Sequence, residues 1–163
     1  MLYIVRSIIE LKTPLHCGGG EADGLLDAPI CRDAFGLWYI PGSSIAGILR
    51  ATVRQSFGRN AEKSLFGITD DEKGIASRVW CSDAVLIDFE GGFAWQAHVE
   101  NREKKILSPS FVRDHVRIDV TTGTAENGGK FDEEYVPTGT RFALEITLNG
   151  WGKEPDKQDL QVF

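Results

Sequence analysis

Asp27 is the residue whose type and setting best suit chemistry. It stands in the apolar stretch Leu25-Leu26-Asp27-Ala28-Pro29, inside an irregular segment over residues 21–36 that is rich in Asp and Gly. Acidic residues in loops are usually just solvated. A carboxylate among apolar neighbours can instead hold Mg²⁺ near a phosphate, or accept a proton from a hydroxyl nucleophile. The residues alone leave these alternatives open.

A second group of candidates lies just before this loop. His16 stands close to the triplet Gly18-Gly19-Gly20. Histidine suits acid–base work beside an RNA 2′-hydroxyl, although a lone histidine is more often structural. The triplet matches neither GxxxxGK[ST] nor GxGxxG, so we interpret it as a strand-ending turn or a backbone contact to RNA. His98 and His115 have no spaced partners and are interpreted as structural.

A third group surrounds the turn Pro41-Gly42-Ser43-Ser44, where Ser43 or Ser44 can cap a helix. The helix is predicted over residues 45–57, because apolar side chains recur there at helical spacing: Ile45, Ile48, Leu49, Thr52 and Val53. Arg50 and Arg54 lie off this stripe. The free N–H groups of the first turn, with Arg50 one to two turns further on, also suit an anion. Ordinary capping and anion binding explain the turn equally well.

The remaining elements are mostly strands. Gly58 closes the first helix, and a second short helix is predicted over 60–66, ending at Gly67. Strands are predicted at 2–12, 37–40, 77–89 and 142–148, with a loop insertion over 90–114. Val116–Val120 and Tyr135–Val136 bracket an extended hairpin with a long tip that holds Thr121-Thr122-Gly123 and Asn127-Gly128-Gly129. This order predicts an α+β fold with helices on one face of a sheet, formed by a single domain over 1–148 and a polar tail over 149–163.

Composition narrows the class of protein. The chain has 163 residues, 42% of them hydrophobic, which suits one folded domain and excludes a disordered chain. No stretch reaches the apolar length of a membrane span, and we expect no secretion signal because Met1 leads directly into a strand pattern. Three cysteines without CxxC spacing favour a reduced, cytoplasmic protein and argue against a structural zinc site.

The charge balance is less decisive. The formal net charge is −6, which lowers the expectation of a nucleic-acid partner. Charge can nevertheless be segregated on one face. Acidic residues cluster at 70–72 and 132–134, whereas basic residues gather at Arg50, Arg54 and Arg59 and again at 102–105.

Together and in this order, these pieces resemble the RAMP superfamily of CRISPR proteins, and within it the type III backbone subunits of the Cas7 group (Csm3-like and Cmr4-like). The resemblance covers residues 3–148. Four stretches carry it, each of them weak alone: PLHCGG at 14–19, LDAPICRD at 26–33, YIPGSSIAGILR at 39–50, and 116–134 with its VRID, TTGTA and FDEE segments.

The resemblance implies an RRM-like (ferredoxin-like) antiparallel sheet with helices on one face, a loop insertion and a protruding thumb hairpin. It implies a protein that lines up with other Cas7-like and RAMP subunits or modules along a guide RNA. The thumb then intercalates along the duplex of guide and complementary target RNA. Base pairing selects the sequence in such a system, while the protein holds shape, phosphate and 2′-hydroxyl.

The resemblance also implies roles for single residues. Asp27 corresponds to the family's catalytic carboxylate for metal-dependent cleavage of target RNA, with Mg²⁺ as the metal and the RNA 2′-hydroxyl as the nucleophile. Contacts to RNA are implied for a second set: His16, Gly18, Gly19, Arg32, Ser43, Ser44, Arg50 and Arg54.

Three departures from the family's pattern keep other hypotheses open. Ala46 stands where such proteins often carry Lys, the net charge is negative, and the family's second half is expected to be missing after Leu148. We therefore expect a fragment, a fused module or a subunit completed by a neighbour, with an apolar sheet face or edge that needs partners. The alternatives are a non-catalytic guide-RNA scaffold or capping subunit, a guide-processing ribonuclease that uses His16 and works in EDTA, and a protein unrelated to RNA.

Overall fold

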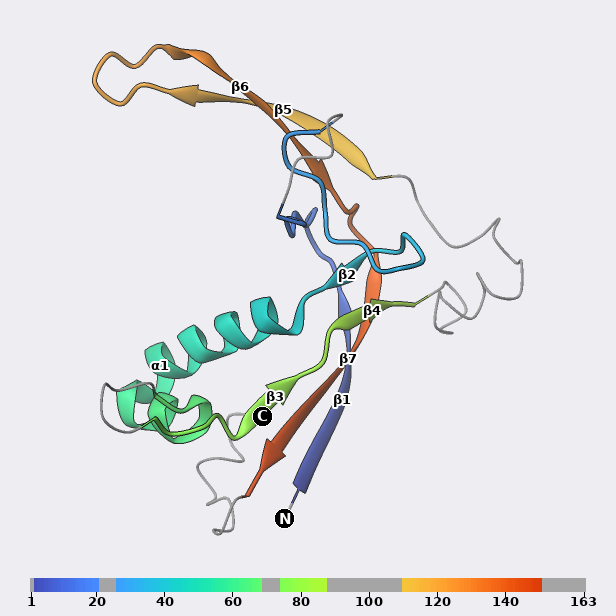
Figure 1. The fold of residues 1–163 in the computed structure, drawn as a ribbon, viewed down its shortest axis with the longest axis vertical. Helices are drawn as coiled ribbons and strands as arrows, with labels where there is room; N and C mark the ends of the chain where they lie inside the picture. Colours follow the sequence, from blue (N-terminus) through green and yellow to red (C-terminus); the bar gives the residue numbers. More distant parts are fainter. Residues whose placement is uncertain (1, 21–25, 69–73, 88–109, 151–163) are drawn as a thin grey trace. The chain divides into compact units, whose positions relative to one another are not determined.

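The structure is a computed structural model that describes residues 2–20, 26–68, 74–87 and 110–150. Its elements follow the order β1 (Leu2–Glu10), β2 (Tyr39–Ile40), α1 (Gly42–Phe66), β3 (Val79–Cys81), β4 (Ala84–Leu86), β5 (Phe111–Ile118), β6 (Ala125–Tyr135) and β7 (Arg141–Asn149) (Figure 1). One sheet has the strand order β1-β7-β4-β2 with β3 also paired to β7, and β5 with β6 forms a separate two-stranded sheet. The predicted α+β class with antiparallel pairing is confirmed.

The chain divides into two compact units, which are described separately below. The first comprises residues 1–8, 40–84 and 143–163, and the second comprises residues 9–39 and 85–142. Over the described residues, no helix combines the length and the apolar character that crossing a membrane requires. Of the loop insertion predicted over 90–114, residues 90–109 lie outside the described residues, as do residues 151–163 of the tail predicted over 149–163.

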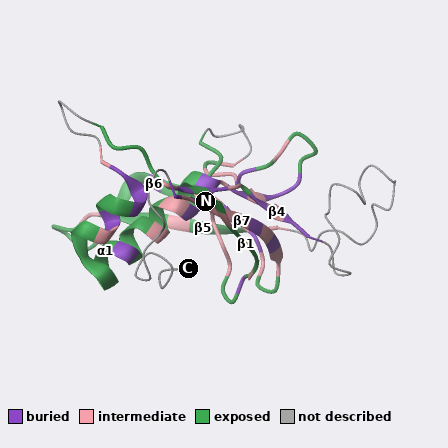
Figure 2. Ribbon diagram, turned by 90° about the horizontal axis from the view of Figure 1, so that it is seen from below, coloured by how far each residue is buried: buried purple, intermediate pink, exposed green. Residues whose placement is uncertain are grey.

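In the first unit, α1 packs against β3. Of the predicted apolar stripe, Ile45 and Val53 are buried, whereas Ile48 is 69% exposed and Thr52 is exposed. Figure 2 shows buried and exposed segments side by side along α1. The stripe was therefore predicted too wide, because a helix that packs on one side against a short strand buries only a narrow row. Further along the helix, Leu65 is completely buried.

The glycines of α1 divide it as predicted. Gly58 has φ +85° and ψ 175°, which interrupts the helix, and Gly67 closes it with φ +70°. The predicted serine cap is wrong, because Pro41 occupies the N-cap position without a side-chain cap. Asp83 supplies the missing acceptor instead, since its Oδ1 accepts the Gly42 N–H at 2.7 Å. Ser43 therefore lies within the first turn.

The predicted strand at 77–89 is two strands, β3 and β4, separated at Ser82 and Asp83. β3 pairs antiparallel with β7, with Val79 opposite Leu148. The ladder breaks after β3 because the Ser82 hydroxyl, and not a backbone carbonyl, accepts the Glu145 N–H at 3.0 Å.

β1 is an edge strand of the sheet, and its apolar side chains at Leu2, Ile4 and Ile8 are 49–57% exposed. The expected exposed edge is therefore present. The need for a covering partner stays a prediction.

In the second unit, β5 and β6 form the predicted hairpin, with Phe111 opposite Tyr135. Two details differ from the prediction: residues 111–114 belong to β5 and not to a loop, and Asn127-Gly128-Gly129 lies inside β6 and not in the tip. The tip is short because Asp119 closes it, its Oδ1 accepting the N–H groups of Thr121 and Thr122 at 2.7 and 3.2 Å. Residues 121–128 are all exposed.

Candidate functional site

Asp27, in the second unit, is fastened to β6 by hydrogen bonds in both directions. Its N–H donates to Asp132 Oδ1 and its Oδ2 accepts the Asp132 N–H, both at 3.1 Å. Next to it, the Ala28 N–H donates to Asp132 O at 3.1 Å, and Ala28 O accepts the Glu134 N–H at 3.0 Å. The loop thus pairs with the base of the hairpin, while Asp27 itself remains exposed.

The two carboxylates form an acidic pair, named here the Asp27–Asp132 pair. The pKa of Asp132 is held below its ordinary value, mainly by the hydrogen bond from the Asp27 N–H and further by a side-chain hydrogen bond with Asp27. Carboxylates fixed beside each other favour a proton or a cation between them. The pair therefore concentrates negative charge on an exposed part of the loop.

The number and type of possible ligands decide which metal ion the Asp27–Asp132 pair could bind. The described residues include no group of three or more His, Cys, Asp and Glu side chains that could hold a metal ion. Mg²⁺ seldom uses such cages and is usually bound through one or two carboxylates together with phosphate oxygens and water. The Asp27–Asp132 pair fits that smaller donor set.

Glu134 fixes the loop that follows Asp27. It is only 4% exposed, and its two carboxylate oxygens accept from the Ile30 N–H at 3.1 Å and from Arg32 Nη2 at 2.5 Å. Arg32 Nη1 also donates to Gly36 O at 3.1 Å. The loop is therefore ordered by an ion pair between a buried carboxylate and an exposed guanidinium group. An RNA contact for Arg32 stays a prediction. Asp33, beside Arg32, accepts the backbone N–H groups of Phe35 and Leu37 and forms no ion pair with another described residue.

His16 and the glycine triplet belong to the same neighbourhood. Nδ1 of His16 lies 2.8 Å from Glu134 O, and the His16 ring packs at a tilt against the ring of Tyr135. The interpretation of the triplet as a strand-ending turn is wrong, since β1 already ends at Glu10. Gly18 instead pairs with Ile30, and the Gly19 N–H donates to Pro29 O at 2.9 Å. The second unit therefore gathers His16, Gly18, Gly19, Asp27 and Arg32 around the base of β6.

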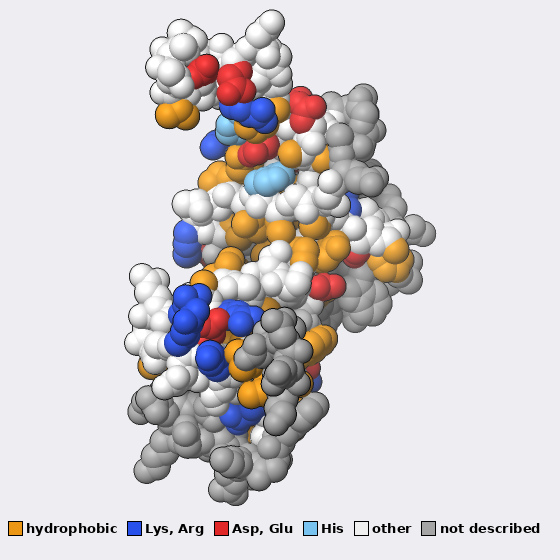
Figure 3. Space-filling model, turned by 60° about the vertical axis from the view of Figure 1, so that its left-hand side comes forward, with side chains coloured by type: hydrophobic (Ala, Val, Ile, Leu, Met, Phe, Trp, Pro, Cys, Tyr) orange, Lys and Arg blue, Asp and Glu red, His pale blue; other side chains and the backbone are white. Residues whose placement is uncertain are grey.

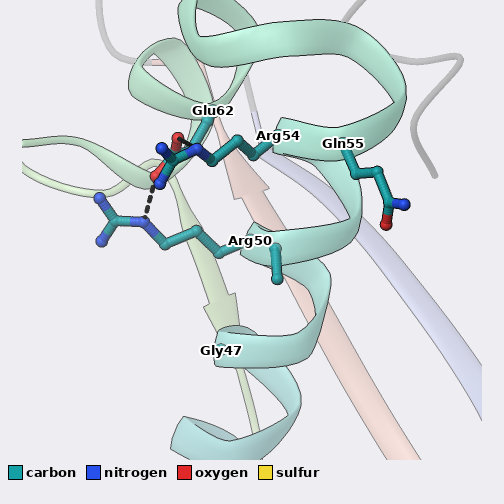
Figure 4. A pocket seen from close by; sticks show the side chains of 6 residues that line it. Gly47, Arg50, Arg54, Gln55 and Glu62 are labelled. Atoms are coloured by element: carbon teal, nitrogen blue, oxygen red, sulfur yellow. Dashed lines mark hydrogen bonds and ion pairs between the residues drawn. The ribbon is translucent and has the colours of Figure 1, made fainter.

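The remaining candidates lie on α1 in the first unit. Ser43 and Ser44 are exposed in its first turn. Arg50 and Arg54 face Glu62, with Arg50 Nε 2.8 Å from Oε1 and Arg54 Nε 3.7 Å from Oε2 (Figure 4). These side chains line a cavity of about 450 Å³ together with Gly47, Ala51 and Gln55. Lys and Arg side chains gather around an acidic one on this face of the molecule (Figure 3).

Glu62 is the centre of this cluster and is only 6% exposed. The hydrogen bond from Arg50 holds the pKa of Glu62 below its ordinary value, and the charges of Arg50, Arg54 and Arg59 act in the same direction. Burial opposes them. Glu62 is therefore ionised at neutral pH. It forms ion pairs with Arg50 and Arg54, which lie on the helical segment before Gly58.

Comparison with known proteins decides the family. The family model described as the RAMP superfamily matches residues 8–163, nearly the whole chain. This chain belongs to the RAMP superfamily. The predicted resemblance is thereby confirmed, including its type III, Cas7-like character.

This RAMP protein also has a similar curated relative, the CRISPR system Cms endoribonuclease Csm3 of Methanocaldococcus jannaschii. The two are 32% identical over an alignment of 181 positions, which covers 98% of this chain and 67% of the relative. Among solved structures, a chain of the type III-B Cmr-beta bound to cognate target RNA has a TM-score of 0.68 at 17% identity. A chain of the apo state has a TM-score of 0.65 at 18% identity. Both matches cover 97% of this chain and 87% of the other, and they show a shared fold.

Sequence reasoning missed three carboxylates that organise the RAMP protein's candidate sites: Asp132, Glu134 and Glu62. The first two were visible only as part of an acidic cluster and of the FDEE segment, with no role assigned to either. Their partners lie far away along the chain, with Asp132 separated from Asp27 by 105 residues. The sequence around Glu62 only weakly indicated its contact with Arg50 and Arg54. Glu62 lies 12 residues after Arg50 and 8 after Arg54, so it can reach them only if the helix changes direction at Gly58.

Proposed function

We propose that this RAMP protein is a subunit of a type III CRISPR effector complex that binds guide RNA and cleaves complementary target RNA next to Asp27. Asp27 carries the proposal, because it is an exposed carboxylate that β6 fixes through both its N–H and its side chain. The similarity to a CRISPR endoribonuclease supports the same reaction. An RRM-like arrangement of the sheet, and other Cas7-like and RAMP subunits as neighbours, are parts of this proposal.

The proposed contacts to guide RNA come from both units. Arg50 and Arg54 supply cations on α1, and the exposed Ser43 and Ser44 lie in its first turn, where the helix dipole favours phosphate. In the second unit we assign backbone contacts to Gly18 and Gly19, with His16 and Arg32 beside them. Such contacts hold the phosphate chain, and base pairing with the guide selects the target.

In the proposed cleavage the 2′-hydroxyl of the target RNA attacks the adjacent phosphorus and gives up its proton. The bond from that phosphorus to the 5′-oxygen of the next nucleotide breaks, so the products are a 2′,3′-cyclic phosphate and a protonated 5′-hydroxyl. Asp27 Oδ2 accepts the Asp132 N–H, so the position of the carboxylate is fixed. Asp27 would hold Mg²⁺, with Asp132 beside it, or would accept the hydroxyl proton directly. When bound, Mg²⁺ supplies polarisation of the phosphate and lowers the pKa of a coordinated oxygen.

A non-catalytic scaffold or capping subunit is the second candidate. One observation favours it: the reciprocal hydrogen bonds between Asp27 and Asp132 are by themselves a sufficient structural reason for an aspartate at position 27. In that case the RNA is bound and left uncut. The third hypothesis, a ribonuclease that uses His16, differs because its activity would persist in EDTA.

The test separates the charge of Asp27 from its structural hydrogen bond. Asp27→Asn keeps an oxygen that can accept the Asp132 N–H, while Asp27→Ala removes both functions. Asp114→Asn is the matched control, since Asp114 is an exposed carboxylate of the same hairpin that pairs with Lys130. We expect both Asp27 variants to lose target cleavage by about 10²–10⁴-fold with guide binding nearly unchanged. Full cleavage by Asp27→Asn would reject the catalytic assignment.

A further inference from the structure

We propose that Cys17 and Cys31 form a reversible oxidation site, at which a low-molecular-weight disulfide such as oxidised glutathione converts the two thiols into an intramolecular disulfide. The bond would join the segment around the glycine triplet to the loop that carries Asp27. This inference does not depend on the proposed function, because it follows from how the two segments pair within the second unit.

The two cysteines lie opposite each other on paired segments, and both carry a thiol. Gly18 forms an antiparallel bridge with Ile30. The next pair in this register is Cys17 with Cys31, and the Cys31 N–H accordingly donates to Cys17 O at 2.8 Å. Opposed residues of an antiparallel pair point their side chains to the same face. Neither side chain therefore has to cross the backbone to reach the other.

The spacing of such a pair suits a disulfide. Residues that face each other at a hydrogen-bonded position of antiparallel segments have Cα atoms about 5.5 Å apart. The Cα atoms of disulfide-bonded cysteines usually lie about 4.4–6.8 Å apart. Cys31 is also turned toward the partner segment, because its thiol donates to Gly18 O at 3.0 Å. The backbone can therefore stay nearly in place when the bond forms.

The two thiols differ in exposure, which sets the order of the reaction. Cys31 is 7% exposed, whereas Cys17 is half-buried. Cys17 therefore loses its proton first, and its thiolate attacks oxidised glutathione, forming a mixed disulfide and releasing one glutathione that takes up the proton. Cys31 then loses its proton and attacks Cys17 Sγ, and the second glutathione leaves as a thiol. Two protein thiols are oxidised and one glutathione disulfide is reduced, so atoms and electrons balance.

Cys81 provides a control within the same chain. It lies in β3 of the first unit and is 7% exposed, and burial raises the pKa of its thiol. A thiol with a raised pKa forms little of the reactive thiolate. We therefore expect Cys81 to stay reduced while the other two cysteines are oxidised.

The experiment treats the folded full chain with oxidised glutathione at about pH 8 and measures the intact mass. Wild type and Cys81→Ala should lose about 2 Da, the mass of two hydrogen atoms. Cys31→Ser should instead retain one glutathione on Cys17, because no second thiol resolves the mixed disulfide, and Cys17→Ser should stay reduced.

Peptide mapping locates the bond. Trypsin leaves both cysteines in one peptide, residues 13–32, and a second cut after Glu21 separates them. The two pieces from oxidised wild type should stay joined until dithiothreitol is added. Oxidised wild type should also melt about 6–12 °C above the reduced protein, since the bond closes a loop of about 15 residues.

Wild type that stays reduced or keeps a glutathione adduct, or a disulfide that involves Cys81, would overturn the proposal. So would a bond that forms only after unfolding in urea, because the native pairing would then not bring the thiols together. A melting temperature that is unchanged or lower after oxidation would show that the bond does not fit the paired segments, which also refutes the proposal.

Discussion

The start of α1 approaches the connection between β3 and β4 so closely that residue 42 has no room for a side chain. A Cβ on Gly42 would lie 2.3 Å from Cys81 O and 2.8 Å from both the carbonyl carbon and the oxygen of Ser82. These obstacles are backbone atoms, and Cys81 is fixed by its pairing with Ile146 of β7. The helix must therefore move if Gly42 is replaced.

The expected cost of Gly42→Ala follows from that clash. Forcing one extra methyl group into a packed site typically costs about 1–3 kcal/mol. Moving the helix also strains the 2.7 Å hydrogen bond from the Gly42 N–H to Asp83. For a chain of this size each kcal/mol corresponds to about 2–4 °C, so we expect the melting temperature to fall by about 2–12 °C.

Gly47→Ala is the matched control for this prediction. It makes the same chemical change in the same helix, but its Cβ meets nothing within 4 Å. Higher helix propensity should make this variant more stable by about 0.5–1 kcal/mol. Thermal unfolding followed by circular dichroism compares the two. A Gly42→Ala variant that melts as high as Gly47→Ala would refute the clash.

Three further predictions concern the ion pairs and the core. Arg50 lowers the folded-state pKa of Glu62 below 4.5, so this contribution to stability is present above pH 4.5 and is lost as the pH falls through the folded-state value. Melting temperatures between neutral and acidic pH should then fall less steeply for Glu62→Gln than for wild type; equal slopes would contradict this. Leu65→Ala should cost about 2–5 kcal/mol in urea unfolding because Leu65 is 0% exposed, and a loss below about 1 kcal/mol would show that α1 is not packed as described. Arg50→Ala should reduce the salt slope of RNA binding by about one, whereas an unchanged slope would remove Arg50 from the RNA contact.

The sequence predicts well those elements whose cause is local. The alternation in β1 and β7, the break at Gly58 and the end of α1 at Gly67 each depend on neighbouring residues or on a glycine's own conformation. The hairpin was predicted for the same reason. Its tip was misplaced because Asp119 closes the turn before the glycines at 127–129 are reached.

The sequence predicted which residues form the candidate site, but not the hydrogen bonds and ion pairs that join them. Asp27 was identified from its setting and from family resemblance, yet nothing near it in sequence reveals that Asp132 exchanges hydrogen bonds with it. The ion pair between Arg32 and Glu134 joins residues 102 positions apart. Such pairs depend on how strands and loops meet. Periodicity and spacing therefore leave them undetermined.

The central claim is that Asp27 directs metal-dependent cleavage of a guided RNA target. The direct measurement assembles the complex with guide RNA and end-labelled complementary RNA and follows cleavage in Mg²⁺ and in EDTA, for wild type and Asp27→Ala. We predict cuts with wild type in Mg²⁺ that disappear in EDTA and in the variant, while the target stays bound. Cuts that persist in EDTA, or that Asp27→Ala makes as wild type does, would contradict the claim.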